Sequence, residues 1–318
     1  FYIRKSNHIK SQFVFLIKID FFSFISYNFL MQKIVVPSEF FSVKDTLDCG
    51  QIFRYTPYNA GYLVFSTDKA CFAETVSDNT VITADDDLYF EEFFDLKRNL
   101  KEVYERALSF GNDFLTKAAE GGKGVRLLRQ NPTETLFSFI VSQNNNIPRI
   151  KKIIEKLCDE LGEKKKFCGV EYRAFPTVEA LKSRDAAFYK SLGLGYRAEY
   201  IVYVANAIAN GDFSIDNAEK LSTAELKKSL LSLKGVGPKV ADCVSLFGFY
   251  RYDSFPVDVW MDKIYREHFG GTLTDRNEQS KYFVNLFGND AGYFQQYMFH
   301  YKRNLEKLAD GAGEKEKI

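Results

Sequence analysis

The sequence has few of the residues that build metal centres and disulfide frameworks. Its 318 residues include three histidines and five cysteines, and no two cysteines form a Cys-x-x-Cys pair. Zinc sites and cysteine-held iron–sulfur clusters need such groups, so neither is expected, and we predict no cofactor. An odd number of unpaired cysteines is typical of a reducing intracellular compartment.

The chain also lacks an excess of charge of one sign. It contains 43 Lys and Arg against 42 Asp and Glu, a net charge of +1, so composition alone does not indicate a nucleic-acid-binding protein. The distribution is uneven, because residues 31–125 carry 10 basic against 16 acidic residues and residues 126–318 carry 29 against 25. We therefore expect a polyanionic partner to lie mainly against the second half.

Uninterrupted apolar runs of membrane-spanning length are missing from the N-terminal region. Its aromatic stretches, Phe13–Ile17 and Phe21–Ser26, are separated by Lys18 and Asp20, whereas a transmembrane helix needs roughly 20 apolar residues. The interrupting charges and the lack of a small-residue cleavage site also argue against a signal peptide. The first methionine is Met31, and we predict that residues 1–30 are a non-native leader outside the fold. A membrane anchor is the alternative.

The sequence as a whole contains 46% apolar residues, enough for a sizeable core. Short apolar runs separated by turn residues between Ile34 and Val81 predict a meander of antiparallel strands. After the glycine-rich break at residues 121–124, successive segments show helix-start signals, such as Asn131 followed by Pro132. The predicted fold class is α+β. We expect an antiparallel β-rich domain over residues 31–124, an all-helical domain over residues 125–310 and a disordered tail over residues 311–318.

A helix–hairpin–helix is predicted in the second half. Ser222 and Glu225 form a capping box that starts a helix. The glycines Gly235 and Gly237 then turn the chain, and Pro238 stands where a first helical turn accepts proline. Backbone N–H groups of such a hairpin hold a DNA phosphate without reading sequence. An ordinary helical corner is the alternative.

Two residues near this motif carry the candidate chemistry. Lys239 lies in the first turn of the second helix, where the positive helix end disfavours an ammonium ion. A neutral amine is a nucleophile that can form a Schiff base with the anomeric carbon of a sugar. Asp258 precedes a further helix and would stabilise a developing sugar cation. A phosphate-binding lysine and a helix N-cap are the simpler interpretations.

Several segments resemble, in the same order, those of the 8-oxoguanine DNA glycosylases, a helix–hairpin–helix family of base-excision repair. They are CGQIFR (Cys49–Arg54), SQNNNIPRI (Ser142–Ile150), LGLGYRAEY (Leu192–Tyr200), GVGPK (Gly235–Lys239), KVADC (Lys239–Cys243) and PVD (Pro256–Asp258). The resemblance extends from about Val43 to Leu305. It implies a monomeric glycosylase and AP lyase that removes 8-oxoguanine opposite cytosine from double-stranded DNA, in a prokaryotic cytoplasm or a eukaryotic nucleus. The alternatives are a glycosylase for another damaged base and a non-catalytic DNA-binding protein.

The resemblance also implies roles for residues of the base pocket. Lys239 would be the nucleophile and Asp258 its partner carboxylate. Cys243 and Phe299 would sandwich the base, and Gln295 would bind its Watson–Crick edge. The carbonyl of Gly50 would accept the proton that 8-oxoguanine carries on N7, where guanine has an acceptor instead.

Further implied roles concern the DNA around the lesion. Asn144 would fill the gap left by the flipped base, Tyr196 would wedge beside it, and Arg149 and Arg197 would bind the orphaned cytosine. The backbone at Gly235 and Gly237 would hold the DNA strand, and the carbonyls of Leu231, Leu233 and Val236 would be able to hold a structural cation. Two features depart from the family: Trp260 replaces a histidine that binds phosphate in animal members, and the segment Gly270–Phe287 is short.

Overall fold

The computed structural model describes residues 33–315, with side chains up to residue 306. The leader predicted for residues 1–30 lies outside the described residues. A five-stranded antiparallel sheet has the order β1-β5-β4-β3-β2, so β2 to β5 form the predicted meander and β1 lies beside β5. The strands are β1 (Lys33–Pro37), β2 (Tyr55–Tyr58), β3 (Gly61–Ser66), β4 (Lys69–Val76) and β5 (Asn79–Ala84).

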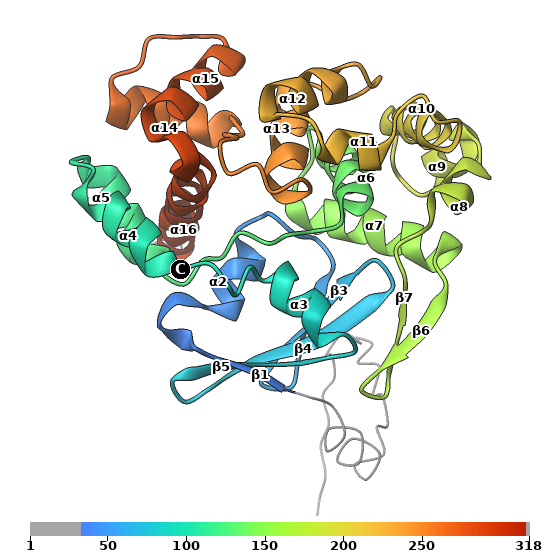
Figure 1. The fold of residues 1–318 in the computed structure, drawn as a ribbon, viewed down its shortest axis with the longest axis horizontal. Helices are drawn as coiled ribbons and strands as arrows, with labels where there is room; N and C mark the ends of the chain where they lie inside the picture. Colours follow the sequence, from blue (N-terminus) through green and yellow to red (C-terminus); the bar gives the residue numbers. More distant parts are fainter. Residues whose placement is uncertain (1–32, 316–318) are drawn as a thin grey trace, which may run out of the picture.

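Helices form most of the rest of the described chain, and the larger group of them lies above the sheet in Figure 1. The helices α2 (Val43–Asp48) and α3 (Asp87–Phe93) contact the sheet, whereas α4 (Leu100–Ser109) and α5 (Asp113–Gly121) pack together beside α16 (Ala291–Lys315). The larger group comprises α6 (Pro132–Ser142), α7 (Ile147–Leu161), α8 (Val178–Lys182), α9 (Ala186–Ser191), α10 (Arg197–Ala209), α11 (Ile215–Glu219), α12 (Thr223–Leu231), α13 (Pro238–Phe247), α14 (Val259–Phe269), α15 (Arg276–Phe287) and α16. The predicted α+β fold class is confirmed.

Capping residues begin the helices where the sequence predicts. The Asn131 side chain accepts a hydrogen bond from the backbone of Glu134, with Pro132 in the first turn of α6. Ser222 and Glu225 form both bonds of the capping box at the start of α12. These side chains satisfy backbone N–H groups that a helix start leaves unpaired.

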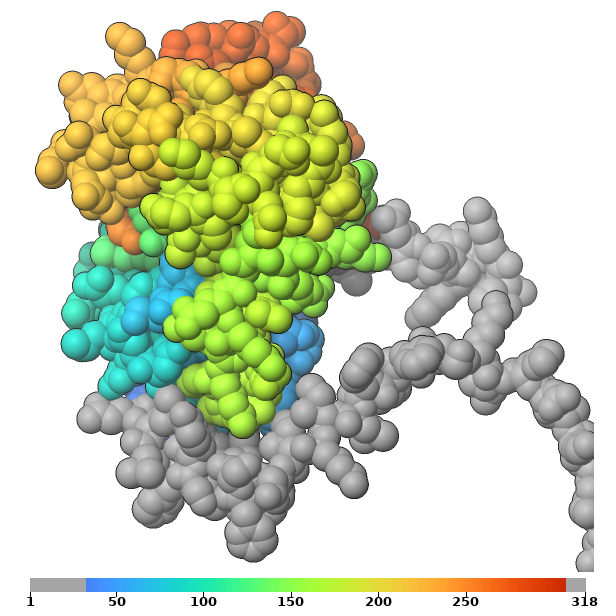
Figure 2. Space-filling model, turned by 90° about the vertical axis from the view of Figure 1, so that its right-hand side faces the viewer, coloured from blue at the N-terminus to red at the C-terminus, as the bar shows by residue number. Residues whose placement is uncertain are grey.

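Two local elements differ from the expectation. The helical half contains a β-hairpin, β6 (Lys164–Phe167) and β7 (Val170–Arg173), and α2 interrupts the expected strands. The hairpin packs Phe167 and Cys168 against Leu63 and Phe72 of the sheet, and Figure 2 shows it lying over the strands. That contact with the sheet stabilises a pair of strands that would be too short to form alone.

At the other end of the chain, α16 continues to Lys315. Of the tail expected over residues 311–318, only residues 316–318 lie outside the described chain. Glu and Lys are frequent after Gly313, and both are good helix formers.

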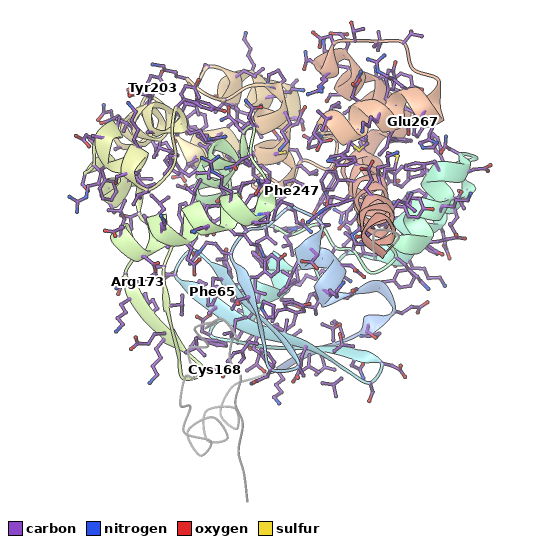
Figure 3. All side chains as sticks on the ribbon, turned by 180° about the vertical axis from the view of Figure 1, so that it is seen from behind. Phe65, Cys168, Arg173, Tyr203, Phe247 and Glu267 are labelled. Atoms are coloured by element: carbon purple, nitrogen blue, oxygen red, sulfur yellow. The ribbon has the colours of Figure 1, made fainter. Side chains whose placement is uncertain are left out.

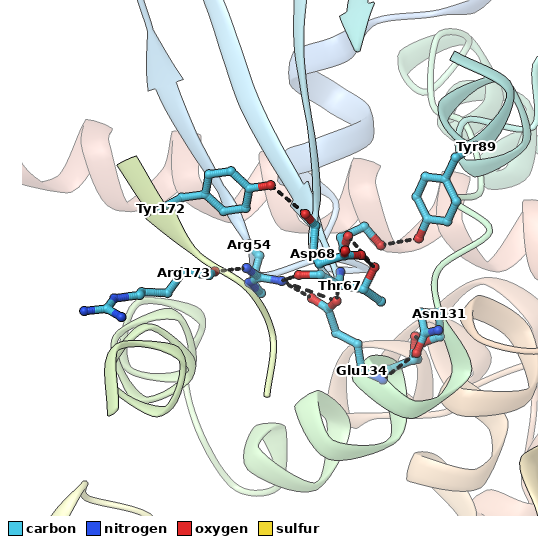
Figure 4. A network of polar contacts seen from close by, with 10 residues as sticks. Arg54, Thr67, Asp68, Tyr89, Asn131, Glu134, Tyr172 and Arg173 are labelled. Carbon is cyan, nitrogen blue, oxygen red and sulfur yellow. Dashed lines mark hydrogen bonds and ion pairs between the residues drawn. The ribbon is translucent and has the colours of Figure 1, made fainter. Parts of the chain in front are cut away.

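A buried ion pair joins the sheet to the helices. Arg54, immediately before β2, donates to Glu134 of α6 at 3.3 Å and to the carbonyls of Thr67 and Arg173. Glu134 also accepts a bond from the backbone N–H of Thr67 at 2.6 Å. Arg54 and Glu134 are 9% and 7% exposed, and the network is drawn in Figure 4. The ion pair therefore links the sheet to the helical layer through Glu134 and to the hairpin through Arg54.

Candidate active site

The predicted helix–hairpin–helix is present between α12 and α13. Gly235 has φ +90°, and a Cβ atom there would lie 2.2 Å from Cγ of Tyr200 on α10. The N–H of Val236 donates to the carbonyl of Leu233 at 3.0 Å, which closes the turn. Position 235 therefore requires glycine for two reasons. Its backbone has a left-handed conformation that other residues rarely adopt, and α10 lies too close to leave room for a Cβ atom.

Asp258 caps the helix that follows. Its Oδ1 accepts hydrogen bonds from the N–H groups of Trp260 and Met261, at 2.9 and 3.0 Å. Both bonds use the same oxygen, so Oδ2 remains able to face a ligand. The N-cap interpretation is confirmed, and it leaves the carboxylate free to have a second role.

A small cavity lies between α13, α16 and the turn that follows α2. Its volume is about 40 Å³, room for a few water molecules and too little for a purine, so its walls must move when a base enters. Phe247, one of its walls, lies inside the molecule between the helices and the sheet (Figure 3). The lining residues are Cys49, Gly50, Phe139, Lys239, Cys243, Phe247, Pro256, Asp258, Gln295, Gln296 and Phe299.

This cavity brings together every residue predicted for catalysis or base binding. Lys239 and Asp258 are separated by nineteen positions in sequence and line the same space. Phe139, Phe247 and Gln296 also line the cavity and were not predicted. The two phenylalanines are apolar residues at helical spacing, which indicates core packing and gives no signal for a pocket. Gln296 belongs to no motif that would single it out.

Lys239 and Cys243 occupy one side of the cavity. The Lys239 ammonium nitrogen lies 5.1 Å from the ring centre of Phe139. Burial raises the pKa of the Cys243 thiol to about 11, although the nearby Lys239 opposes the shift. Since only a thiolate is strongly nucleophilic, the raised pKa disfavours Cys243 as a nucleophile, and the role of Lys239 remains a prediction.

The turn at Gly50 is held from both sides. The Gln51 side chain, fully buried, donates to the carbonyls of Thr46 and Arg126, and its oxygen accepts from the N–H of Leu128. On the other side, the Tyr55 hydroxyl donates to Asp48 at 2.6 Å. These bonds fix the backbone orientation on which a carbonyl contact from Gly50 depends.

Gly50→Ala tests that geometry. Gly50 has φ +83°, and an added Cβ would lie 3.2 Å from Cε1 of Phe299. Alanine at this positive φ strains the turn by roughly 1–3 kcal/mol, and the turn relieves the strain by shifting the Gly50 carbonyl. We therefore expect excision to fall by about 10-fold or more. Single-turnover rates on lesion-containing DNA measure the effect, and a rate equal to that of the wild type would show that this backbone position is not critical.

A larger groove leads to the cavity from the surface. Its volume is about 1010 Å³, and it shares Lys239 and Asp258 with the cavity. The starts of α13, α14 and α15 and the turn at residues 142–145 form its walls. Trp260 lines it, with the Lys263 ammonium 5.1 Å from the indole ring. The groove and the cavity therefore meet at Lys239 and Asp258.

Asn144, predicted to fill the gap in the DNA, lies in the turn before α7, and Tyr196 lies beside it at the N-cap of α10. Asn144 is exposed with φ +44°, and its Nδ2 donates to the Tyr196 hydroxyl at 3.3 Å. Arg149 is exposed, and its guanidinium reaches the carbonyl of Gly193 at 3.4 Å. Both side chains are accessible to DNA.

Arg197, in contrast, is only 4% exposed. It donates to the carbonyls of Gln143, Asn144 and Leu194. In this structure its guanidinium braces the backbone of the turn that presents Asn144. The role in binding cytosine remains a prediction, and it requires some of these bonds to break.

Of the three carbonyls considered for a structural cation, that of Leu233 accepts the bond that closes the hairpin, and the cation site remains a prediction. The described residues include no group of three or more His, Cys, Asp or Glu side chains placed to hold a metal ion. Within the same residues, no helix is both long and apolar enough to span a membrane.

Lys239, two residues beyond the hairpin glycines, and Asp258, at the start of the next helix, give this helix–hairpin–helix the arrangement typical of base-excision repair proteins. Family models agree. Residues 33–136 match the 8-oxoguanine DNA glycosylase N-terminal domain, and residues 137–286 match the HhH-GPD superfamily of base excision DNA repair proteins. The chain belongs to the 8-oxoguanine DNA glycosylase family.

Individual relatives support this assignment. A probable N-glycosylase/DNA lyase of Methanothermobacter thermautotrophicus is 31% identical over 70% of this chain and 78% of its own length. The 8-oxoguanine glycosylase/lyase of Clostridium acetobutylicum, solved with double-stranded DNA containing cytosine opposite 8-oxoguanine, is 32% identical with a TM-score of 0.81, covering 87% of this chain and 98% of that one.

The match to a eukaryotic relative spans a smaller share of both proteins. The N-glycosylase/DNA lyase of Saccharomyces cerevisiae is 37% identical over 54% of this chain, and the match spans about half, 49%, of the yeast protein.

Proposed function

We propose that this protein is a DNA glycosylase that removes 8-oxoguanine opposite cytosine and then cleaves the strand as an AP lyase. The observation that carries the proposal is the convergence of Lys239 and Asp258 on one cavity with Gly50, Gln295, Cys243 and Phe299. The structural similarity to the Clostridium enzyme bound to such DNA supports the choice of lesion and partner base. We further propose that it acts as a monomer, in a prokaryotic nucleoid or a eukaryotic nucleus.

Excision begins when the damaged nucleotide leaves the stack and enters the cavity. The Lys239 amine attacks C1′ of the sugar as the C1′–N9 bond breaks and the base departs with the bonding electrons. Asp258 stabilises the positive charge that develops on the sugar, using the oxygen that does not cap α14. A proton from the amine then returns to the base, and the sugar opens to a Schiff base on Lys239.

Strand cleavage follows from the same intermediate. The iminium carbon acidifies the proton at C2′, and its removal expels the 3′ phosphate by β-elimination. Water then hydrolyses the Schiff base and restores the free amine of Lys239. No cofactor is needed, because the protonated imine is the electron sink.

Recognition of the lesion rests on the Gly50 carbonyl. 8-Oxoguanine carries a proton on N7 and donates to this oxygen, whereas guanine presents a lone pair that the carbonyl repels. The buried bonds of Gln51 hold the carbonyl in place, so a guanine cannot easily push it aside.

Duplexes that contain 8-oxoguanine opposite cytosine, other oxidised or alkylated bases, or guanine test the proposal. Incubation with borohydride reduces the Schiff base and traps the protein on DNA. We expect excision and trapping with 8-oxoguanine and neither with guanine. Preference for another lesion would indicate a different glycosylase of the same fold, and binding without trapping would indicate a non-catalytic DNA-binding protein.

Arg149→Ala tests the proposed reading of the opposite base. Arg149 is exposed beside the turn that carries Asn144, and loss of one bidentate base contact costs about 1–3 kcal/mol. We expect excision to fall roughly 5- to 150-fold with cytosine opposite the lesion and much less with the other three bases. An equal loss with all four partners, accompanied by weaker salt dependence, would assign Arg149 to phosphate binding.

A further inference from the structure

The cavity contains a second buried glutamine, next to the one proposed to bind the base. Gln295 and Gln296 both line it, and they are 4% and 3% exposed. Phe299, one turn further along α16, lines it as well. The function proposed above uses Gln295 and Phe299 and assigns nothing to Gln296.

The carbonyl of Pro256 fixes the orientation of both amides. This oxygen can only accept a hydrogen bond, so the NH₂ group of Gln295 faces it, at 3.3 Å. The Oε1 atom of Gln295 therefore points the other way, where it accepts a bond from Nε2 of Gln296 at 2.9 Å. Since Gln296 donates with its nitrogen, its own oxygen faces away from Gln295.

That oxygen has no protein partner. Gln296 Oε1 is buried and accepts no hydrogen bond from the described residues. A buried acceptor of this kind is costly to the folded protein, and such atoms are often found where a ligand supplies the missing donor. Gln296 lines the cavity, so a base that enters and displaces the cavity walls can meet two amide oxygens, that of Gln296 and, through its second lone pair, Oε1 of Gln295.

We infer that Gln296 determines specificity by accepting a hydrogen bond from the 2-amino group of a guanine-type base. This inference rests on the proposed function. The Watson–Crick edge of guanine presents two adjacent donors, N1–H and the 2-amino group, which match two neighbouring acceptors. Adenine presents an acceptor at N1, and hypoxanthine lacks the 2-amino group, so neither satisfies both oxygens.

The experiment compares excision of 8-oxoguanine and 8-oxohypoxanthine, each opposite cytosine, because these bases differ only in the 2-amino group. For the wild type we expect about 5- to 150-fold slower excision of 8-oxohypoxanthine, the cost of one unsatisfied buried acceptor. Gln296→Met preserves the approximate length of the side chain and removes its hydrogen-bonding groups. In this variant the ratio of the two rates should fall close to one, since the group that detects the amine is gone.

Gln279→Met is the matched control. Gln279 is also fully buried, and its Oε1 has no partner among the described residues. Its Nε2 donates to Asp262 at 2.6 Å and to the carbonyl of Leu273, and it does not line the cavity. This variant should keep the wild-type ratio of the two rates.

The outcomes separate the inference from the proposed function. If Gln296→Met slows both substrates equally and the ratio is unchanged, Gln296 only packs against Gln295 and the inference is wrong. If the wild type excises neither base, the proposed function itself fails. Should Gln296→Met not fold, inhibition of the wild type by the free bases provides a second test: stronger inhibition by 8-oxoguanine than by 8-oxohypoxanthine supports the inference, and equal inhibition contradicts it.

Discussion

Lys239→Gln is expected to abolish base release and borohydride trapping, with rates reduced at least ~10³-fold, while leaving DNA binding intact. The amide has no nucleophilic amine, so neither the attack on C1′ nor the Schiff base can form. Binding persists because the backbone of Gly235–Gly237, which the substitution does not touch, is the part that holds a phosphate. Trapping on lesion-containing DNA and a binding titration with the same duplex measure the two effects.

Lys234→Gln is the matched control for this prediction. Lys234 lies in the same hairpin, is exposed and does not line the cavity. Its loss should weaken DNA binding modestly and in a salt-dependent way, with trapping intact. A Lys239→Gln protein that still forms the adduct would show that another amine is the nucleophile.

Asp258→Asn should reduce excision at least ~100-fold with little change in the free energy of unfolding. Asparagine is as good an N-cap as aspartate, so the bonds to Trp260 and Met261 can be kept. It carries no charge, however, and cannot stabilise the sugar cation. Single-turnover kinetics and thermal unfolding on the same sample distinguish the two roles.

Asp185→Asn offers a comparison at a helix start remote from the cavity. Asp185 caps α9 by accepting a bond from the N–H of Phe188 at 2.9 Å, and its replacement should alter neither stability nor turnover appreciably. Normal excision by Asp258→Asn would reduce Asp258 to a structural cap.

Features encoded by neighbouring residues were predictable from the sequence. The cap at Asn131, the capping box at Ser222 and the turn at Gly235 depend on side chains within a few positions of the backbone groups that they satisfy or release. The candidate residues Lys239 and Asp258 stand beside such local signals, which is why their places in the fold could be anticipated. Their convergence on one cavity followed only from the family resemblance.

Features created by distant contacts gave no usable signal. The strand Lys164–Phe167 is short and mostly charged, and it forms because Phe167 packs on a sheet built nearly a hundred residues earlier. Arg197 is buried by carbonyls of the turn at Gln143 and Asn144, more than fifty positions away. Likewise, the unpartnered oxygen of Gln296 exists because Pro256 orients its neighbour.

The ion pair of Arg54 and Glu134 has a consequence for how the chain unfolds. Removing either the sheet or the helical layer would leave one of these charges buried without its counter-ion, at a cost of about 3–5 kcal/mol. Cys49 and Phe53 from the first third of the chain also belong to the same hydrophobic core as the helices. The two topological halves are thus one cooperative unit: they should melt in a single transition, and neither is a module that could be exchanged between proteins without the other.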